Sequence, residues 1–369
     1  MSTANSLSSR ISDNIKNRWK AYKVLDAKGK RIWWVDFFAR NFIYIIIIIL
    51  VIYVQYFSIV NNFANRFISL NPIVDIINRS SASLFLALGV GGIIVLTGTD
   101  LSAGRIMGLM ACVAASLLQN PLDIFPAKMF PDLSAPPIVL VMLFVMLLGG
   151  VIGLFNGFFV STFKLHPFIV TLSTMIMLNG VVLWYVGMNG GGPIAGITAE
   201  YRNFVMGTVE IGDTRVPYFV FYAIAATIIM WFIWNKTTLG KNMYAVGANP
   251  EAASVSGISV KMTTILIFMI GGILYGFSGF VEAARVGSNS PSTGFMAELD
   301  AIAACVIGGV SFTGGVGKIR GIVTGVILLQ VIAVALQWLG VSSDIRLVIT
   351  GALILLAVSL DMRKYLSKK

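Results

Sequence analysis

The chain has 369 residues, of which 57% are hydrophobic and only 12% are charged, and its mean hydropathy is +0.86. Soluble globular domains carry about 25% charged residues, so this composition excludes a water-soluble fold. The net charge of +11 is what a membrane protein with basic cytoplasmic segments carries, and it gives no indication of nucleic-acid binding.

Apolar stretches recur along most of the chain and predict about ten membrane crossings. A helix needs about 20 apolar residues to cross a bilayer. The sequence therefore predicts an all-α integral membrane protein, a polytopic bundle of about ten transmembrane helices. The long stretches are 41–60, 80–99, 138–163, 167–188, 216–235, 262–281 and 321–341; the shorter 106–119, 301–312 and 347–360 fit either a full crossing or a re-entrant segment.

The first 40 residues are polar and basic, and they precede the first apolar stretch. Within them Ile11, Ile15, Trp19 and Tyr22 fall at helical spacing among Lys and Arg residues. This pattern fits an amphipathic helix on an anionic cytoplasmic surface, or equally a solvated basic tail. The expected organisation is a cytoplasmic segment 1–40, a transmembrane domain 41–362 with a cytoplasmic loop 236–261, and a basic tail 363–369.

The distribution of Lys and Arg predicts the orientation of the chain. With a cytoplasmic N-terminus and ten crossings, the inside segments hold 20 of the 27 basic residues and the outside segments hold 7. Basic residues concentrate in cytoplasmic loops, so both termini are expected inside the cell.

Polar residues inside apolar stretches are candidates for a translocation path. Three of them form a polar break near residue 100, which indicates a tight turn or a broken helix. The alternative is interhelical hydrogen bonding, worth about 0.6 kcal/mol on average in membranes, and Asp100 could instead cap the following helix. The candidates are Thr99, Asp100, Ser102, Asn156, Thr171, Thr174 and Asn179.

Glycines repeat every four residues in two places. Such rows allow transmembrane helices to approach backbone to backbone, so we expect a tightly packed bundle. They do not distinguish one class of membrane protein from another. The rows are Gly149, Gly153 and Gly157, and Gly317, Gly321 and Gly325.

The polar loop 236–261 contains a short helix with clear start and stop signals. Asn249 is a favourable N-cap, Pro250 suits the first helical position, and Gly257 suits the C-terminal stop. So short a helix cannot be stable alone because nucleation is costly. It is expected to dock, either on its own bundle or on a partner protein. The residues assigned to this docking are Asn249, Pro250, Glu251, Ala252, Ala253, Ser254 and Gly257.

Glu298 and Asp300 stand before the short stretch 301–312, and Lys318 and Arg320 follow it. Two residues apart on a helix, the acids point roughly 200° from each other and cannot share one site. We expect one acid to cap the helix and the other to face an outer gate or an external binding protein.

Several motifs together carry a resemblance to a known family. These are "LTGTDLSAGR" (96–105), "WNKTTLGKNMYAVG" (234–247), "NPEAASVSG" (249–257), "ELDAIAACVIGGVSFTGGVG" (298–317) and "GVSSDIRLVITGALILLAVSLD" (340–361). They resemble the permeases of ABC-type monosaccharide importers in the ribose and galactose branch. The resemblance covers about residues 76–365, and "NPEAASVSG" is similar to the coupling-helix loop of such permeases.

The resemblance implies a non-catalytic transport subunit in the inner membrane of a bacterium. It implies four partners: a second permease subunit, expected to be an identical copy; a cytoplasmic ATPase; a periplasmic or lipid-anchored sugar-binding protein; and a monosaccharide, galactose/methyl-galactoside or glucose. ATP and magnesium are expected on the ATPase, with no cofactor on this chain. The alternative substrate is another small hydroxylated solute: ribose, xylose or a nucleoside.

Two other classes of function fit the residues poorly. In "GGVGKIRG" the phosphate-loop pattern G-x-x-x-x-G-K-[ST] fails at Phe312 and Ile319. One His and two Cys cannot supply the usual zinc spacings, so no metal site is expected. His166 and Ser278 fall near opposite membrane faces, too far apart for the Ser–His pair of a serine hydrolase. An ion-coupled symporter needs acids inside the membrane, whereas the acids here fall at segment ends.

Overall fold

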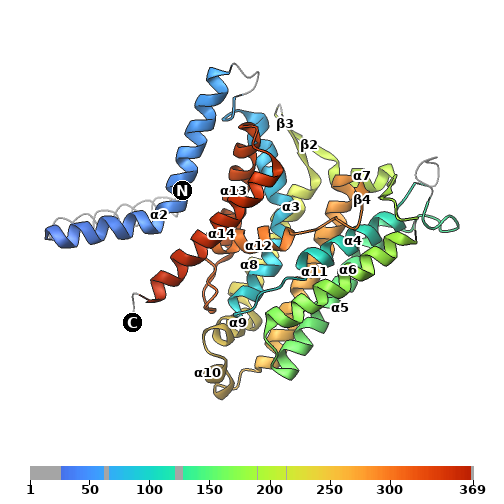
Figure 1. Ribbon diagram of the computed structural model, residues 1–369. Coiled ribbons are helices and arrows are strands. Elements are labelled where there is room, and N and C mark those ends of the chain that lie inside the picture. Colours follow the sequence, from blue (N-terminus) through green and yellow to red (C-terminus); the bar gives the residue numbers. More distant parts are fainter. Residues whose placement is uncertain (1–25, 62–65, 121–127, 189, 213, 367–369) are drawn as a thin grey trace. The chain divides into compact units, whose positions relative to one another are not determined.

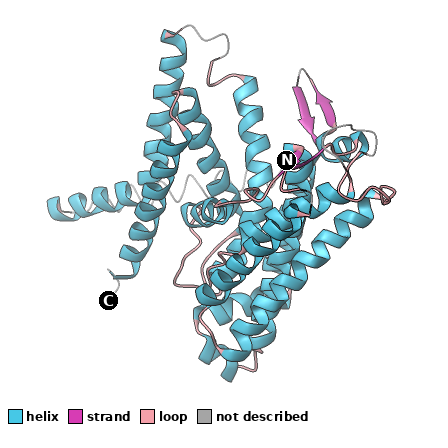
Figure 2. Cartoon of the chain, turned by 45° about the vertical axis from the view of Figure 1, so that its right-hand side comes forward, coloured by secondary structure: helices cyan, strands magenta, loops and turns pink. Residues whose placement is uncertain are grey.

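The structure of this chain, a computed structural model, describes residues 26–61, 66–120, 128–188, 190–212 and 214–366. The expected amphipathic helix around residues 11–22 lies outside these residues, whereas residues 27–40 of the basic segment form the start of a helix. The chain divides into two units, Met1–Leu50 and Val51–Lys369, and the bundle described below belongs to the second. Figures 1 and 2 show helices throughout, with short strands near one end of the bundle.

The elements follow the chain in this order: α2 (Ala27–Val60), α3 (Leu70–Val95), α4 (Ala103–Leu117), α5 (Ile138–Phe163), α6 (Pro167–Gly187), β1 (Ile194–Ala195), α7 (Ala199–Met206), β2 (Thr208–Ile211), β3 (Thr214–Pro217), α8 (Tyr218–Lys236), α9 (Thr238–Ala248), α10 (Pro250–Val255), α11 (Val260–Val286), β4 (Ser288–Asn289), α12 (Ala297–Ile307), α13 (Ile319–Trp338) and α14 (Ser343–Leu366).

Among the described residues, six helices are long and apolar enough to cross a membrane: α3, α5, α6, α8, α11 and α13. Shorter apolar helices are 45–60 and α4. The predicted stretch 301–312 is not helical to its end, because α12 stops at Ile307. With 11 residues α12 rises only about 16 Å, roughly half of the hydrocarbon core of about 30 Å.

Helix α11 lies at the centre of the bundle, where it packs against α3, α4 and α5. The contact with α5 has almost no side-chain layer. A Cβ added at Gly149 would collide with the backbone of Gly272, and one at Gly153 with the backbone of Phe268. The glycine row on α5 therefore lies directly against the α11 backbone, the close approach that small residues allow in membranes.

The turn between α5 and α6 shows why the chain reverses there. Lys164 ends α5 in the left-handed conformation, with φ 52°. The side chain of His166, the single histidine, then accepts a hydrogen bond from the Phe168 N–H, and Pro167 occupies the first helical position. His166 is thus an N-cap, a role in which it satisfies one of the free N–H groups of the helix start.

Short strands and α7 cover the end of the bundle opposite α10 (Figure 1). Strands β2 and β3 form an antiparallel hairpin, and β1 pairs with β4. The fully buried hydroxyl of Tyr201, on α7, donates to the Phe280 carbonyl of α11 at 2.5 Å. This end of the bundle is therefore fixed onto the central helix.

Candidate coupling loop and translocation pathway

Helix α10 is the short capped helix expected between α9 and α11. The Asn249 side chain accepts a hydrogen bond from the Ala252 N–H at 2.9 Å, and Pro250 stands at the start of the helix. Gly257 follows with φ +81°, and the next N–H, of Ile258, bonds to the Ala253 carbonyl at 3.0 Å. The local sequence thus specifies both ends of α10 through capping alone.

Most side chains of α10 point away from the rest of the chain. Ala253 is buried, whereas Pro250, Glu251, Ala252 and Ser254 are exposed. Val255 is 91% exposed. A six-residue helix that shows water an aliphatic side chain and an acid has a surface suited to a protein partner.

Behind α10, three parts of the chain meet at the level of the backbone. The Gly315 N–H donates to the Val95 carbonyl at 2.8 Å, so the α12–α13 loop is bonded to the end of α3. A Cβ at Gly247 would collide with the same carbonyl, and one at Gly314 with the Gly247 carbonyl. We call Val95, Gly247, Gly314 and Gly315 the backbone junction. Of these four residues, Gly314 and Gly315 adopt positive φ, 79° and 67°, a conformation that favours glycine.

The polar break near residue 100 belongs to a buried hydrogen-bond network. The Asp100 carboxylate accepts from the Ser102 hydroxyl at 2.6 Å, and that hydroxyl accepts from the Asn156 amide at 2.9 Å. Thr174 donates to the Asn156 side-chain oxygen at 2.6 Å. Thr171 donates to the Thr99 carbonyl at 3.0 Å. Contacts from the loop before α4 to α5 and α6 thus join residues far apart in the sequence.

In this conformation the network packs helices and lines no open path. Asp100, Ser102, Asn156, Thr171 and Thr174 are all buried. Their role in translocation stays a prediction. Asn179 lies apart from them on an exposed face of α6. Helix α4 is preceded by Ser102 at its N-cap position, without a side-chain cap, so Asp100 stands before the cap instead of forming it.

Glu298 and Asp300 lie in the first turn of α12, with Met296 at the N-cap and no side-chain cap. The two acids face different surroundings, as their spacing predicts. Glu298 is 6% exposed, with one carboxylate oxygen packed on Gly104 and without a hydrogen-bond partner. Asp300 is exposed. Both acids lie in the first turn, where the helix dipole favours negative charge, and the division of roles between them stays a prediction.

Arg105, the last residue of the motif at 96–105, lies inside the bundle. It is 5% exposed and donates to the Pro291 carbonyl at 2.7 Å. Its guanidinium also lies over the Phe295 ring, 4.9 Å from the centroid. Arg105 thus ties the start of α4 to the stretch before α12. Asp100 and Glu298 are also buried, and both lie at helix ends as the sequence predicts, Asp100 before α4 and Glu298 in the first turn of α12.

The second glycine row is split between a loop and a helix. Gly317 precedes α13, where it contacts Val95 and Val310 side chains. Gly321 and Gly325 lie on α13, and a Cβ at either would collide with the α12 backbone. This row therefore brings α12 and α13 into close contact along one turn only.

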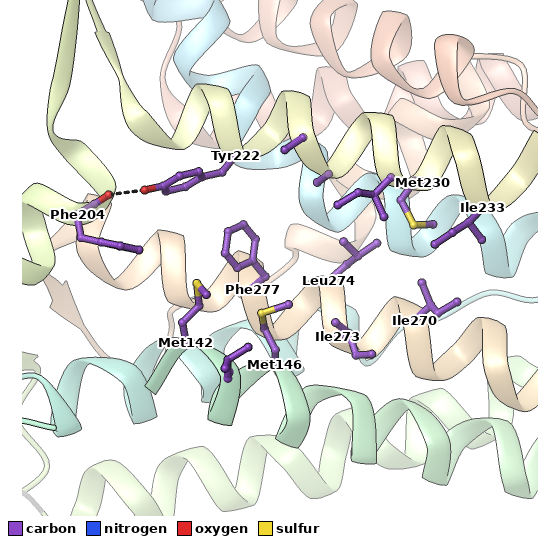
Figure 3. A pocket seen from close by; sticks show the side chains of 14 residues that line it. Met142, Met146, Phe204, Tyr222, Met230, Ile233, Ile270, Ile273, Leu274 and Phe277 are labelled. Carbon is purple, nitrogen blue, oxygen red and sulfur yellow. Dashed lines mark hydrogen bonds between the residues drawn. The ribbon is translucent and has the colours of Figure 1, made fainter. Parts of the chain in front are cut away.

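A large hollow between α5, α8 and α11 is apolar (Figure 3). Its one hydroxyl, of Tyr222, donates back to the Phe204 carbonyl at 2.8 Å. Met142, Met146 and Phe277 point into it. With no free polar group in its lining, this hollow suits hydrocarbon, such as a lipid chain, and cannot hold a hydroxylated solute.

Sequence reasoning did not single out several of these residues. Gly247, Gly314 and Gly315 lay inside quoted motifs, but only the three-dimensional contact gives them a role. Glu282 and Arg285 form an ion pair at 2.8 Å on α11, at a spacing of three that could have indicated it. Both line a small polar hollow that also contains Asp300.

Residues 72–358 match a family model described as branched-chain amino acid transport system / permease component. The galactose/methyl galactoside import permease protein MglC of Escherichia coli (strain K12) is 47% identical over 303 residues, 82% of this chain and 90% of that protein. MglC of Haemophilus influenzae is 42% identical over 334 residues, 90% and 97% of the two chains. The D-allose transport system permease protein AlsC of Escherichia coli (strain K12) is 35% identical over 295 residues, 80% and 84%. No solved structure matches the chain significantly.

Proposed function

Because this chain belongs to the family of branched-chain amino acid transport system permease components, we propose that it is the permease of an ATP-driven importer for galactose or methyl galactoside. The relatives whose names specify these sugars are the most similar of those above and cover most of both chains. Glucose is included, because it differs from galactose at one hydroxyl. The D-allose relative supports the alternative, another small hydroxylated solute taken up by the same mechanism.

The observation that carries the proposal is the exposed short helix α10 at one end of a bundle of membrane-length helices. A partner ATPase that binds ATP and magnesium docks on α10 and drives transport. A second copy of this chain completes the path, and a periplasmic or lipid-anchored sugar-binding protein delivers the sugar at the other end. No hydrolysis takes place on this chain.

The proposed topology has ten crossings with both termini in the cytoplasm. Helix α12 contributes only part of the eighth crossing, and the stretch after it supplies the rest. The bundle 41–362 is the permease domain, and the loop 236–261 is its coupling loop. Asp300 faces the outer gate.

Uptake measurements test this function directly. The chain, with the ATPase and binding protein encoded beside it, is expressed in a strain without galactose importers. We expect saturable uptake of labelled galactose that fails when the ATPase cannot hydrolyse ATP. A protonophore added while ATP is kept high should leave uptake intact. Loss of uptake under that condition would instead support an ion-coupled symporter.

A further inference from the structure

A small polar hollow lies among α3, α4, α11 and α12, apart from the buried network. It is lined on one side by apolar groups, including Leu86 and Met107, and on the other by polar and charged groups. Its polar lining consists of Ser83, Ser278, Glu282, Arg285 and Asp300.

The hollow extends from helix ends toward the middle of α3: Glu282 and Arg285 lie near the end of α11, and Asp300 lies in the first turn of α12. Ser83 stands near the middle of α3, and its hydroxyl accepts from the Gln330 amide, near the middle of α13, at 2.9 Å. Ser278 lies on α11 and is buried.

The charged groups in the hollow are only partly satisfied by one another. Arg285 donates to both carboxylate oxygens of Glu282, through Nε at 2.9 Å and Nη2 at 2.8 Å. Among the described residues Asp300 takes part in no ion pair, and its side chain is exposed to the hollow. An ionised carboxylate has about four acceptor sites, so Glu282 and Asp300 both keep free acceptors.

We propose that this hollow binds one edge of the transported sugar. Asp300 and Glu282 accept hydrogen bonds from adjacent hydroxyl groups, and Arg285 donates to a ring or hydroxyl oxygen. Leu86 and Met107 contact the apolar face of the sugar ring. The ligand is an uncharged polyol, because the acceptors and donors of the hollow match hydroxyl groups. This inference rests on the proposed function.

The test uses the complete transporter in proteoliposomes, with ATPase and binding protein. Asp300→Asn and Glu282→Gln each replace one acceptor oxygen by an amide. Hydrogen bonds to charged groups contribute more to binding free energy than those between neutral groups. We therefore expect about a tenfold loss of galactose uptake efficiency in each variant. Asp75→Asn is the matched control, since Asp75 also pairs with an arginine on a helix, Arg79, but outside the hollow. It should transport like the wild type.

Deoxygalactoses separate binding from gating. For the analogue that lacks the hydroxyl bound by Asp300, the Asp300→Asn variant and the wild type should transport equally well. The ratio of variant uptake to wild-type uptake is compared between sugars, because this ratio cancels any selectivity of the binding protein. A loss that is the same for galactose and every deoxy analogue would overturn the proposal, as would variants with wild-type uptake of galactose. If the wild type transports no monosaccharide, the proposed function itself fails.

A labelling experiment covers variants that do not accumulate in the membrane. Both native cysteines, Cys112 and Cys305, are buried, so Asp300→Cys introduces one accessible thiol. A small polar thiol reagent should modify it, and saturating galactose should slow the modification at least fivefold, whereas mannitol should not. Equal rates with and without galactose would contradict the proposed site.

Discussion

Gly104 shows at the scale of one residue how little space the bundle leaves around its acids. A Cβ there would collide with the Glu298 carboxylate and the Gly294 carbonyl. Gly180, on α6, has no atom within 4 Å of such a Cβ. Two glycines that look alike in the sequence thus differ completely in what they permit.

We expect Gly104→Ala to destabilise the protein by about 1–3 kcal/mol, because overpacking forces the backbone or Glu298 to move. Gly180→Ala should be neutral or stabilising by up to about 1 kcal/mol, since alanine favours the helix. Thermal unfolding in detergent, followed by size-exclusion fluorescence, measures both. Equal melting temperatures for the two variants would contradict the packing at Gly104.

The buried network makes a separate prediction through Asn156, which links Ser102 to Thr174. Asn156→Ala removes both bonds, each worth about 0.6 kcal/mol on average in membranes, so it should cost about 1.2 kcal/mol. Uptake should fall no more than twofold at matched abundance. Unchanged stability with a more than tenfold loss of uptake would show that Asn156 contacts the sugar instead. Asn179→Ala, at an exposed position, should affect the stability of the isolated chain least.

At the scale of the element, the coupling loop is set by capping and turn geometry within a few residues. Gly257 has φ +81° and open space around it, so a side chain there strains the backbone without a clash. Gly287, at the other end of α11, has φ +74° and open space as well. The two positions therefore form a matched pair at opposite ends of one helix.

We expect Gly257→Leu to uncouple ATP hydrolysis from uptake, because the new side chain alters the exit of α10 and obstructs its docking. Gly287→Leu should cost similar stability but leave coupling intact. Glu251→Lys, which reverses the exposed charge of α10, should also uncouple. Uptake and ATPase activity are measured on the same proteoliposomes. Normal coupling in both Gly257→Leu and Glu251→Lys would show that α10 is not the docking helix.

The sequence predicts elements well where local signals decide, and poorly where distant parts of the chain decide. The bounds of α5 were predicted as observed, at 138–163, and so were the caps of α10. Helix α3 begins at Leu70, ten residues before the predicted crossing, and Asp75 and Arg79 form an ion pair in this additional part of the helix. The network at Asn156, the burial of Arg105 and the backbone junction depend on contacts between distant segments, which one sequence does not encode in its local pattern.

At the scale of the whole molecule, basic residues gather at the end that carries α9 and α10. Lys241 and Lys318 are exposed there, whereas Thr208 and Ser288 are exposed on the strands. The positive-inside rule assigns the first end to the cytoplasm. The two ends therefore provide exposed sites for testing the orientation.

Single cysteines test this orientation in intact cells. Lys241→Cys and Lys318→Cys should resist an impermeant maleimide until the cells are opened, whereas Thr208→Cys and Ser288→Cys should react at once. The buried native cysteines supply no background. Labelling of Lys318→Cys from outside would show that the stretch through α12 does not complete a crossing.

The backbone junction has a further consequence for energy use by the transporter. A side chain can change its rotamer when a neighbouring helix moves. Two peptide groups that are hydrogen-bonded to each other cannot adjust in this way, so their helices move together. Val95 and Gly315 are bonded in this way, and Gly247 lies directly against the Val95 carbonyl at the end of α9, just before Asn249 and the start of α10. A shift of α10 should therefore reach the end of α3 and the start of α13 almost undiminished. We therefore expect tight coupling, in which each ATPase cycle that moves α10 also rearranges the translocation pathway.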